Sequence, residues 1–410
     1  MQQFSEFITE EKNTHMTHIE DKVIYGGVNG TRQAILALRS LRDTLGGSHG
    51  GTVSVKWDGA PAIFAGTDPT NGKFFVAKKG IFNKSPKLYY TAADVDADNS
   101  GDLADKLKLA LKHLPSIGIK GVIQGDFLFS QSDLTKATIN GKKYLTFHPN
   151  TIVYAVPADL SDMHLAIRAA KIGIVWHTTY VGDSFPTMRA QYGVNVARLK
   201  KNKNVWMQDA VLRDMTKFIM SKSDTEEVNE YLREAGRIFN KISGTTLRTL
   251  EGDPNLAQHI ETHTNSYVRA GSLPPNPSRR VTALIKFIQQ KYKKEMDTRK
   301  TDRGKEAQQK KLDALMSFFS TENKSSLVQM FKLQQMIVLA KLKLINTLNK
   351  LSSTKTFVKT KRGYKVTGAE GYVAVDKLGG DAVKLVDRLE FSFNNFSPSI
   401  LKGWDKPTRT

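Results

Sequence analysis

The sequence lacks cysteine and is poor in acidic residues for its length. With no cysteine in 410 residues, a disulfide framework and a cysteine-based zinc site are excluded. A reducing compartment is permitted but not proved. Forty Asp and Glu stand against 61 Lys and Arg, which gives a formal net charge of +21. This excess favours a polyanionic partner such as nucleic acid over an acidic small molecule.

Long hydrophobic runs are also missing. No stretch of about 18 apolar residues occurs, and the first residues lack the pattern of a signal peptide. We therefore expect a soluble, cytoplasmic protein without a membrane partner. A hydrophobic content of 40% over this length predicts two or three domains with sizeable cores.

The charge and the texture of the chain both change near residue 200. Residues 200–362 hold 32 Lys and Arg but only 16 Asp and Glu, so most of the positive excess lies there. Apolar residues recur at i, i+3, i+4 and i+7 in this region, which predicts helices over 205–221, 225–242, 281–299, 304–320 and 325–351. We predict a basic, all-helical domain over 201–360, although a lysine-rich surface that serves only solubility would have a similar composition.

Outside that region the chain is dominated by short strands. The segment 53–64 is a β-rich run that delivers Lys56, turns at Asp58-Gly59 and resumes as an apolar strand. A lysine between apolar neighbours can have a lowered pKa, and the neutral amine is a nucleophile. Lys-x-Asp-Gly by itself more often marks only a hairpin, so its partners must come from elsewhere in the chain.

Several later segments supply charged residues on predicted strands. Residues 74–82 form a strand that ends in Lys78 and Lys79, and Asp126 lies within the apolar strand 121–129. A buried carboxylate is expensive unless it meets a cation, a hydroxyl or a metal ion. His177, on the buried strand 172–180, is more typical of a core histidine than of a ligand. The acidic stretch 92–101 is predicted to be a loop that leads into a helix and not a calcium-binding loop, since the glycine and glutamate of such a loop are missing.

The last strands complete this set. Glu370 lies on one predicted strand and Lys384 on the next, across a turn at Gly379-Gly380. Three cations and two carboxylates on strands are what is needed to hold a nucleoside triphosphate with Mg²⁺. Their motifs follow one another in a fixed order: Lys56-Trp-Asp-Gly59, Lys78-Lys-Gly80, Gly125-Asp-Phe127, Glu370-Gly-Tyr-Val373 and Val383-Lys-Leu-Val-Asp-Arg388.

In this order the motifs resemble those of the covalent nucleotidyltransferases, the superfamily of ATP-dependent DNA and RNA ligases and mRNA capping enzymes, in a tailed-phage branch. The resemblance covers residues 50–180 and 363–392. It implies an α+β fold in which an adenylation domain of antiparallel sheets, residues 1–200 and 361–410, receives the helical domain as an insertion. For a phage protein the compartment would be the host cytoplasm, and DNA repair is a matching process.

The resemblance also implies roles for individual residues. Lys56 would attack the α-phosphate of ATP and form lysyl-AMP, with Asp58 beside it to orient the amine and Gly59 at the nucleotide. Lys78 would contact the nucleotide or a 5′-phosphate. The adenylate would then pass to a 5′-phosphate end, and a 3′-hydroxyl would seal the strand.

The remaining roles concern the nucleotide and the metal. Asp126 would hydrogen-bond the ribose and, together with Glu370, help to bind Mg²⁺ or Mn²⁺. Phe147 would stack on the adenine, and Lys384 would neutralise the α-phosphate. Arg388 would lie on the same strand face as Lys384 and replace a second motif lysine that is missing here.

Three departures from the family pattern qualify these roles. Asp126 stands where a glutamate is usual, the second motif lysine is absent, and about 22 residues after Arg388 are too few for an OB domain. We therefore expect the helical insertion to grip the nucleic acid through phosphate contacts.

Several alternatives stay open at this stage. The motifs lean towards DNA ligases at Lys56 and towards RNA ligases at Glu370, so the substrate is DNA, RNA or a mixed duplex. A GTP-dependent capping-type enzyme and a non-catalytic phage protein that binds nucleic acid with a decayed ligase core are the rivals. We expect a monomer in each case.

Overall fold

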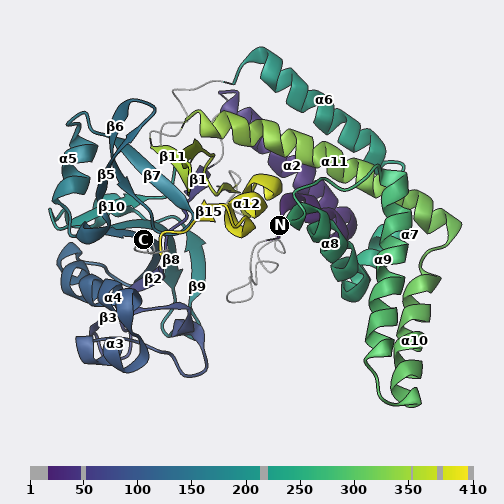
Figure 1. Cartoon of the computed structure of the whole chain (residues 1–410), viewed down its shortest axis with the longest axis horizontal. Helices are drawn as coiled ribbons and strands as arrows, with labels where there is room; N and C mark the ends of the chain where they lie inside the picture. The colour runs from purple at the N-terminus through teal and green to yellow at the C-terminus, as the bar shows by residue number, and fades with distance from the viewer. Residues whose placement is uncertain (1–16, 48–51, 213–219, 352–353, 376–381, 405–410) are drawn as a thin grey trace, which may run out of the picture.

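The computed structural model describes residues 17–47, 52–212, 220–351, 354–375 and 382–404. It is an α+β fold with largely antiparallel sheets, as predicted. The two six-stranded sheets lie at one side of the molecule and most of the long helices lie at the other (Figure 1). The predicted turn at Gly379-Gly380 falls outside the described residues.

The first six-stranded sheet has the order β10-β8-β4-β2-β3, with β9 paired to β8. Its strands are β2 (Ala62–Thr67), β3 (Phe74–Ala77), β4 (Val122–Ser130), β8 (Ile172–Val181), β9 (Arg189–Tyr192) and β10 (Val205–Asp209). Helix α4 (Gly101–His113) packs its apolar side on this sheet, where Leu107 shares a core with Ile123 and Ile174. The predicted strands at 74–82, 121–129 and 172–180 are confirmed in the main, although only 74–77 of the first is strand.

Two local predictions in this region are wrong. Residues 92–98 form helix α3 (Ala92–Asp98) and not a loop, because Thr91 and Asp94 make a reciprocal capping box at its start. Residues 205–209 form β10, parallel to β8, and not the start of a helix. A short apolar run fits either element, and here a free edge of the sheet decides it.

The second six-stranded sheet joins distant parts of the chain. Its order is β12-β11-β7-β6-β5, with β15 paired to β11. The strands are β5 (Thr135–Ile139), β6 (Lys142–Phe147), β7 (Ile152–Pro157), β11 (Lys355–Thr360), β12 (Gly363–Val366) and β15 (Ile400–Leu401), and α5 (Asp162–Ala169) follows β7. The closing segment thus pairs with strands some 200 residues earlier, as a discontinuous domain requires.

The third sheet has the strand order β1-β13-β14 and is the one that carries the motif lysines. It consists of β1 (Thr52–Lys56), β13 (Gly371–Val375) and β14 (Ala382–Leu385). Successive side chains alternate between its two faces. Val53, Tyr372, Val383 and Leu385 are buried in the core of the helical module, so the opposite face is left for polar residues.

The helical module contains α6 (Lys222–Phe239), α7 (Gly244–Gly252), α8 (Pro254–Arg269), α9 (Pro277–Asp297), α10 (Asp302–Ser317) and α11 (Thr321–Asn349). The predicted helices at 225–242, 281–299, 304–320 and 325–351 are confirmed within four residues at each end. The remaining helices are α1 (Lys22–Tyr25) and α2 (Gly27–Leu45), with α12 (Arg388–Phe396) after β14. Short 3-10 turns occupy Ile19–Asp21, Lys79–Phe82, Leu114–Ile117, Gln131–Asp133 and Val196–Arg198.

Helix α2 belongs to this helical module and not to the sheets. Leu38 and Leu45 are buried in the same core as Leu232 of α6 and Leu344 of α11. The predicted division into 1–200 and 201–360 therefore does not follow the packing, because an amphipathic helix is buried wherever a matching apolar face is available. No helix among the described residues is long and apolar enough to cross a membrane.

Candidate active site

Lys56 and Lys384 project from the same face of the three-stranded sheet. Lys56 pairs with Gly371 across β1 and β13, and Lys384 pairs with Val373 across β13 and β14. Residues directly opposite one another share a face, and so do residues two apart on one strand. The register therefore brings two lysines that are 328 positions apart in the sequence to one polar surface.

Glu370 forms an ion pair with Lys56 at the edge of this face. The Lys56 ammonium donates a hydrogen bond to the Glu370 carboxylate. The lysine side chain is 36% exposed and the glutamate 11%. Burial raises the pKa of Glu370 in spite of the lysine charge, and the nearby Asp58 charge adds to the increase. Burial, together with the charges of Lys56 and Arg388, lowers the pKa of Lys384.

Asp126 reaches the same region from β4. Burial raises its pKa to about 7, the charges of Lys56 and Lys79 oppose the increase, and those of Glu370 and Asp58 add to it. Gly59 lies against this strand, and a β-carbon at Gly59 would come within 2.5 Å of the Asp126 β-carbon. The turn after Lys56 thus needs glycine because the chain passes so close to β4. Lys79 thus acts on this carboxylate as well, which its place at the end of a predicted strand did not indicate.

His177 also belongs to this group, contrary to its interpretation as an ordinary core histidine. The pairing of β4 with β8 shifts from Gln124 opposite Thr178 to Gly125 opposite Trp176, which leaves His177 as the extra residue of a β-bulge. Bulges commonly re-aim a side chain. The His177 Nε2 lies 3.9 Å from Asp126 Oδ2. Burial and the Lys56 charge lower the pKa of His177 to about 4, so its ring is neutral at pH 7.

Asp58 is held by the loop between β6 and β7. Its carboxylate accepts hydrogen bonds from Asn150 Nδ2 at 2.6 Å and from the backbone N–H groups of Thr151 and Ile152 at 2.7 and 2.8 Å. Its own N–H donates to the Tyr154 hydroxyl at 2.7 Å. These contacts lock the turn after Lys56 onto the second sheet, a structural role that the motif did not predict.

Two predicted site residues have other functions in the structure. Phe147 is 2% exposed and lies in the core between Phe129 and Tyr154, with ring centroids at 4.9 and 5.4 Å. Because the Phe147 ring is enclosed by these neighbours, it has no open face on which an adenine could stack, and the stacking assignment is wrong. Lys78 donates to Asn99 at 2.6 Å and lies 3.8 Å from Asp98, at the end of α3.

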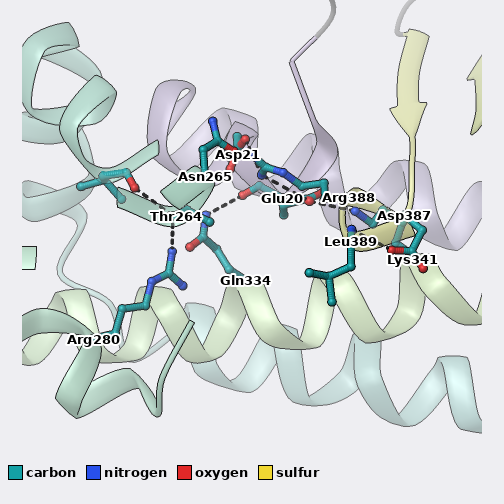
Figure 2. A network of polar contacts seen from close by, with 11 residues as sticks. Glu20, Asp21, Thr264, Asn265, Arg280, Gln334, Lys341, Asp387, Arg388 and Leu389 are labelled. Carbon is teal, nitrogen blue, oxygen red and sulfur yellow. Dashed lines mark hydrogen bonds and ion pairs between the residues drawn. The ribbon is translucent and has the colours of Figure 1, made fainter. Parts of the chain in front are cut away.

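Arg388 is not on the strand of Lys384. It is the first residue of α12, because Asp387 caps this helix by accepting hydrogen bonds from Leu389 and Glu390. Figure 2 shows its guanidinium turned into a polar network between the N-terminal segment and the helices, where it donates to Asp21 at 2.8 Å and to Asn265 at 2.5 Å. Arg388 therefore does not replace the missing motif lysine.

The comparisons with known proteins give a family and nothing closer. A family model matches residues 13–399. The chain belongs to DUF6267, a family of unknown function. No curated protein and no solved structure matches it. For this DUF6267 protein the geometry of the site must therefore carry the functional argument.

Glu370 and Asp126 could hold a metal ion that takes most of its other ligands from a phosphate-containing substrate and water. No group of three or more His, Asp or Glu side chains that could hold a metal ion occurs among the described residues. Mg²⁺ is commonly held by only one or two carboxylates together with substrate phosphates and water. Glu370 and Asp126 of this DUF6267 protein can supply that number.

A small recess with room for about one water molecule opens beside Glu370. Four carboxylates contribute to its lining, from Asp58, Glu370, Asp387 and Glu390. This lining disfavours a triphosphate, whose charge is better matched by the sheet face with Lys56 and Lys384. The site can thus present the Lys56 amine and the Lys384 cation on the sheet face, with two or more carboxylates beside them.

Proposed function

We propose that this protein is an ATP-dependent polynucleotide ligase that works through a lysyl-AMP intermediate. The proposal rests on one observation: the Lys56 charge acts on the pKa values of Asp126, Glu370 and Lys384, which come from strands or strand ends far apart in the sequence. A cluster of titratable groups with shifted pKa values is typical of a functional site.

In the first step, the Lys56 amine attacks the α-phosphorus of ATP. The N–P bond forms, the bond from the α-phosphorus to the bridging oxygen breaks, and pyrophosphate leaves with the electron pair. The ammonium must lose a proton first, and its contact with Glu370 supplies an adjacent acceptor. Lys384, on the same sheet face, would stabilise the charge that develops on the α-phosphate.

Glu370 and Asp126 would hold Mg²⁺, which neutralises phosphate charge when it is bound. The adenylate then passes to a 5′-phosphate end, and a 3′-hydroxyl displaces AMP to form the phosphodiester. In this proposal the basic helical module contacts the phosphates of the nucleic acid. A strand-sealing assay on DNA, RNA and mixed duplexes distinguishes among these three substrates.

A covalent labelling assay tests the proposal. The protein is incubated with Mg²⁺ and α-labelled ATP or GTP and examined for an acid-labile adduct. We expect labelling by ATP that is lost in Lys56→Ala and kept in Lys73→Ala, a matched change at an exposed lysine. Labelling that persists in Lys56→Ala would exclude this lysine as the nucleophile, and labelling by GTP alone would indicate a capping-type enzyme.

One observation favours a second candidate function. Arg388 is engaged at the start of α12, so the missing motif lysine has no replacement on β14. A non-catalytic protein that binds nucleic acid and retains a decayed ligase core would have this feature. The absence of any adduct with either nucleotide, together with binding of duplex nucleic acid, would favour this second function.

A further inference from the structure

The hairpin of α9 and α10, residues 277–317, is a basic projection of the helical module, and we call it the basic hairpin. Helix α10 packs on α9, and Figure 1 shows the two side by side at the edge of the molecule away from the sheets. Between residues 286 and 311 the chain has ten basic and only four acidic residues. All ten are exposed: Lys286, Lys291, Lys293, Lys294, Arg299, Lys300, Arg303, Lys305, Lys310 and Lys311.

These cations are distributed around the hairpin and gather at its turn. Helix α9 buries Leu284, Ile288 and Tyr292, and α10 buries Leu312 and Leu315. By helical periodicity Lys286 and Lys293 lie opposite the buried face of α9, and Arg303 and Lys310 lie opposite that of α10. Arg303, together with Arg299, Lys300 and Lys305, also surrounds the turn between the helices. The charge therefore covers both outer sides and the tip.

Few of these charges are neutralised within the protein. Among the described residues Lys310 is the one of the ten in an ion pair, with Glu306 at 3.0 Å, and both side chains are exposed. Cations elsewhere in the module behave differently: Lys343 contacts Asp224 and Glu227 at 2.7 and 2.6 Å. A solvated cation without an ion pair can contact an external phosphate without first breaking an interaction within the protein.

We propose that the basic hairpin is a docking surface for the phosphate backbone of duplex nucleic acid. The ligand class rests on the proposed ligase function. Phosphate contacts carry no sequence information, which suits an enzyme that must act on ends of any sequence. An anionic membrane is a poorer match, because the hairpin has no exposed large hydrophobic residue that could enter a bilayer.

The test compares two fourfold variants that lose the same charge. In the tip variant Arg299, Lys300, Arg303 and Lys305 are each changed to Ala. In the control Lys222, Arg233, Arg237 and Lys241, exposed on or just after α6, are changed to Ala. Binding of a labelled, nicked DNA duplex of about 40 base pairs is followed by anisotropy between about 50 and 200 mM salt. Circular dichroism verifies that both variants are folded.

We expect the tip variant to bind the duplex at least about tenfold more weakly. The slope of log affinity against log salt, which is negative, should become shallower by about 3 to 4. The control variant should change the affinity and the slope much less. Equal losses in the two variants, or unchanged binding by the tip variant, would overturn the proposal. So would a loss of binding to phosphatidylserine vesicles alone.

Self-labelling by ATP, measured on the same samples, separates this inference from the proposed function. The tip variant should label as the wild type does, because the hairpin contributes no residue to the Lys56 group. If the wild type does not label while the tip variant still loses duplex binding, the ligase proposal fails and the docking surface stands.

Discussion

Two groups of charged side chains in this protein differ in what surrounds them. The Lys56 group is partly open: the side chains of Lys56, Asp126 and Glu370 are 36%, 19% and 11% exposed. The network of Glu20 and Lys341, which includes Arg388, is closed, with exposures of 5%, 1% and 11%. Both contain acids and bases in contact, but only the first faces solvent.

Partner charges outweigh burial for Glu20 and Arg388 of the network, but not for Asp126, Glu370 or Lys384 of the Lys56 group. In the Lys56 group, burial raises the pKa of Asp126 and Glu370 and lowers that of Lys384, so the partners do not compensate for the burial. In the network, burial would raise the pKa of Glu20, but Lys341 and Arg388 lower it to about 2. The Asp21 and Glu20 charges likewise raise the pKa of Arg388 against its burial. The first group leaves charge for a ligand to neutralise, whereas the second compensates Glu20 and Arg388 internally. Asp21 is the exception in the network, because burial raises its pKa to about 7.

The largest expected effect is on the closed network. Lys341→Met leaves Glu20 buried and short of one cation, so the free energy of unfolding should fall by about 3–5 kcal/mol in urea denaturation. Lys310→Met, which breaks an exposed pair, should cost less than about 1 kcal/mol. Combining Lys341→Met with Glu20→Leu should recover much of the loss. Equal losses of unfolding free energy in Lys341→Met and Lys310→Met would mean that the buried pair contributes no more to stability than an exposed one.

The same network predicts an acid limit to stability. The pKa of Glu20 is about 2 in the folded protein against 4.5 as its ordinary value. Its stabilising contribution is therefore present above about pH 4.5 and is lost as the pH falls towards 2. This part of the acid dependence should be absent in the double variant.

The next expected effect is on the open group and concerns activity instead of stability. Lys384→Met removes a cation from the face of Lys56, and the rate of self-labelling by ATP should fall by about 10²-fold or more. The free energy of unfolding should change little, because burial disfavours the charged form of Lys384 and the charge therefore adds little to stability. Lys359→Met, on the exposed side of β11, is the matched control and should leave labelling unchanged. A large loss of stability in Lys384→Met would place Lys384 with the structural charges.

A further expected effect is the pH dependence introduced by Asp126. Its pKa is raised from 3.8 to about 7, so the folded protein holds this proton over a range in which the unfolded chain has lost it. Stability therefore falls as the pH rises from about 4 to 7 and levels off above that. Asp126→Asn should match the wild type near pH 4 and exceed it at pH 8 by about 1 to 4 kcal/mol. A variant that is less stable at pH 8 would mean that the charged form is favoured in the folded protein.

Much of the site could be predicted from the sequence because it depends on local patterns. Strand signals place Lys56 at the end of β1, and Asp126 within β4. Two elements that differ from the prediction have a local signal in the sequence: Asp387 is a strong N-cap residue before Arg388, and Thr91 with Asp94 is a capping pair. Phe147 and His177 had no such signal, because the sequence does not say whether an aromatic ring faces a core or which residue a bulge leaves unpaired.

The sequence by itself determined the periodicities, the caps, the excess of charge after residue 200 and the order of the motifs. Only the tertiary structure decided which charges meet. Register across β1, β13 and β14 brings Lys56 and Lys384 to one face, while capping at Asp387 turns Arg388 towards Asp21. Local propensity acts over a few residues, but the desolvation and pairing of a charge depend on neighbours that can be hundreds of residues away in the chain.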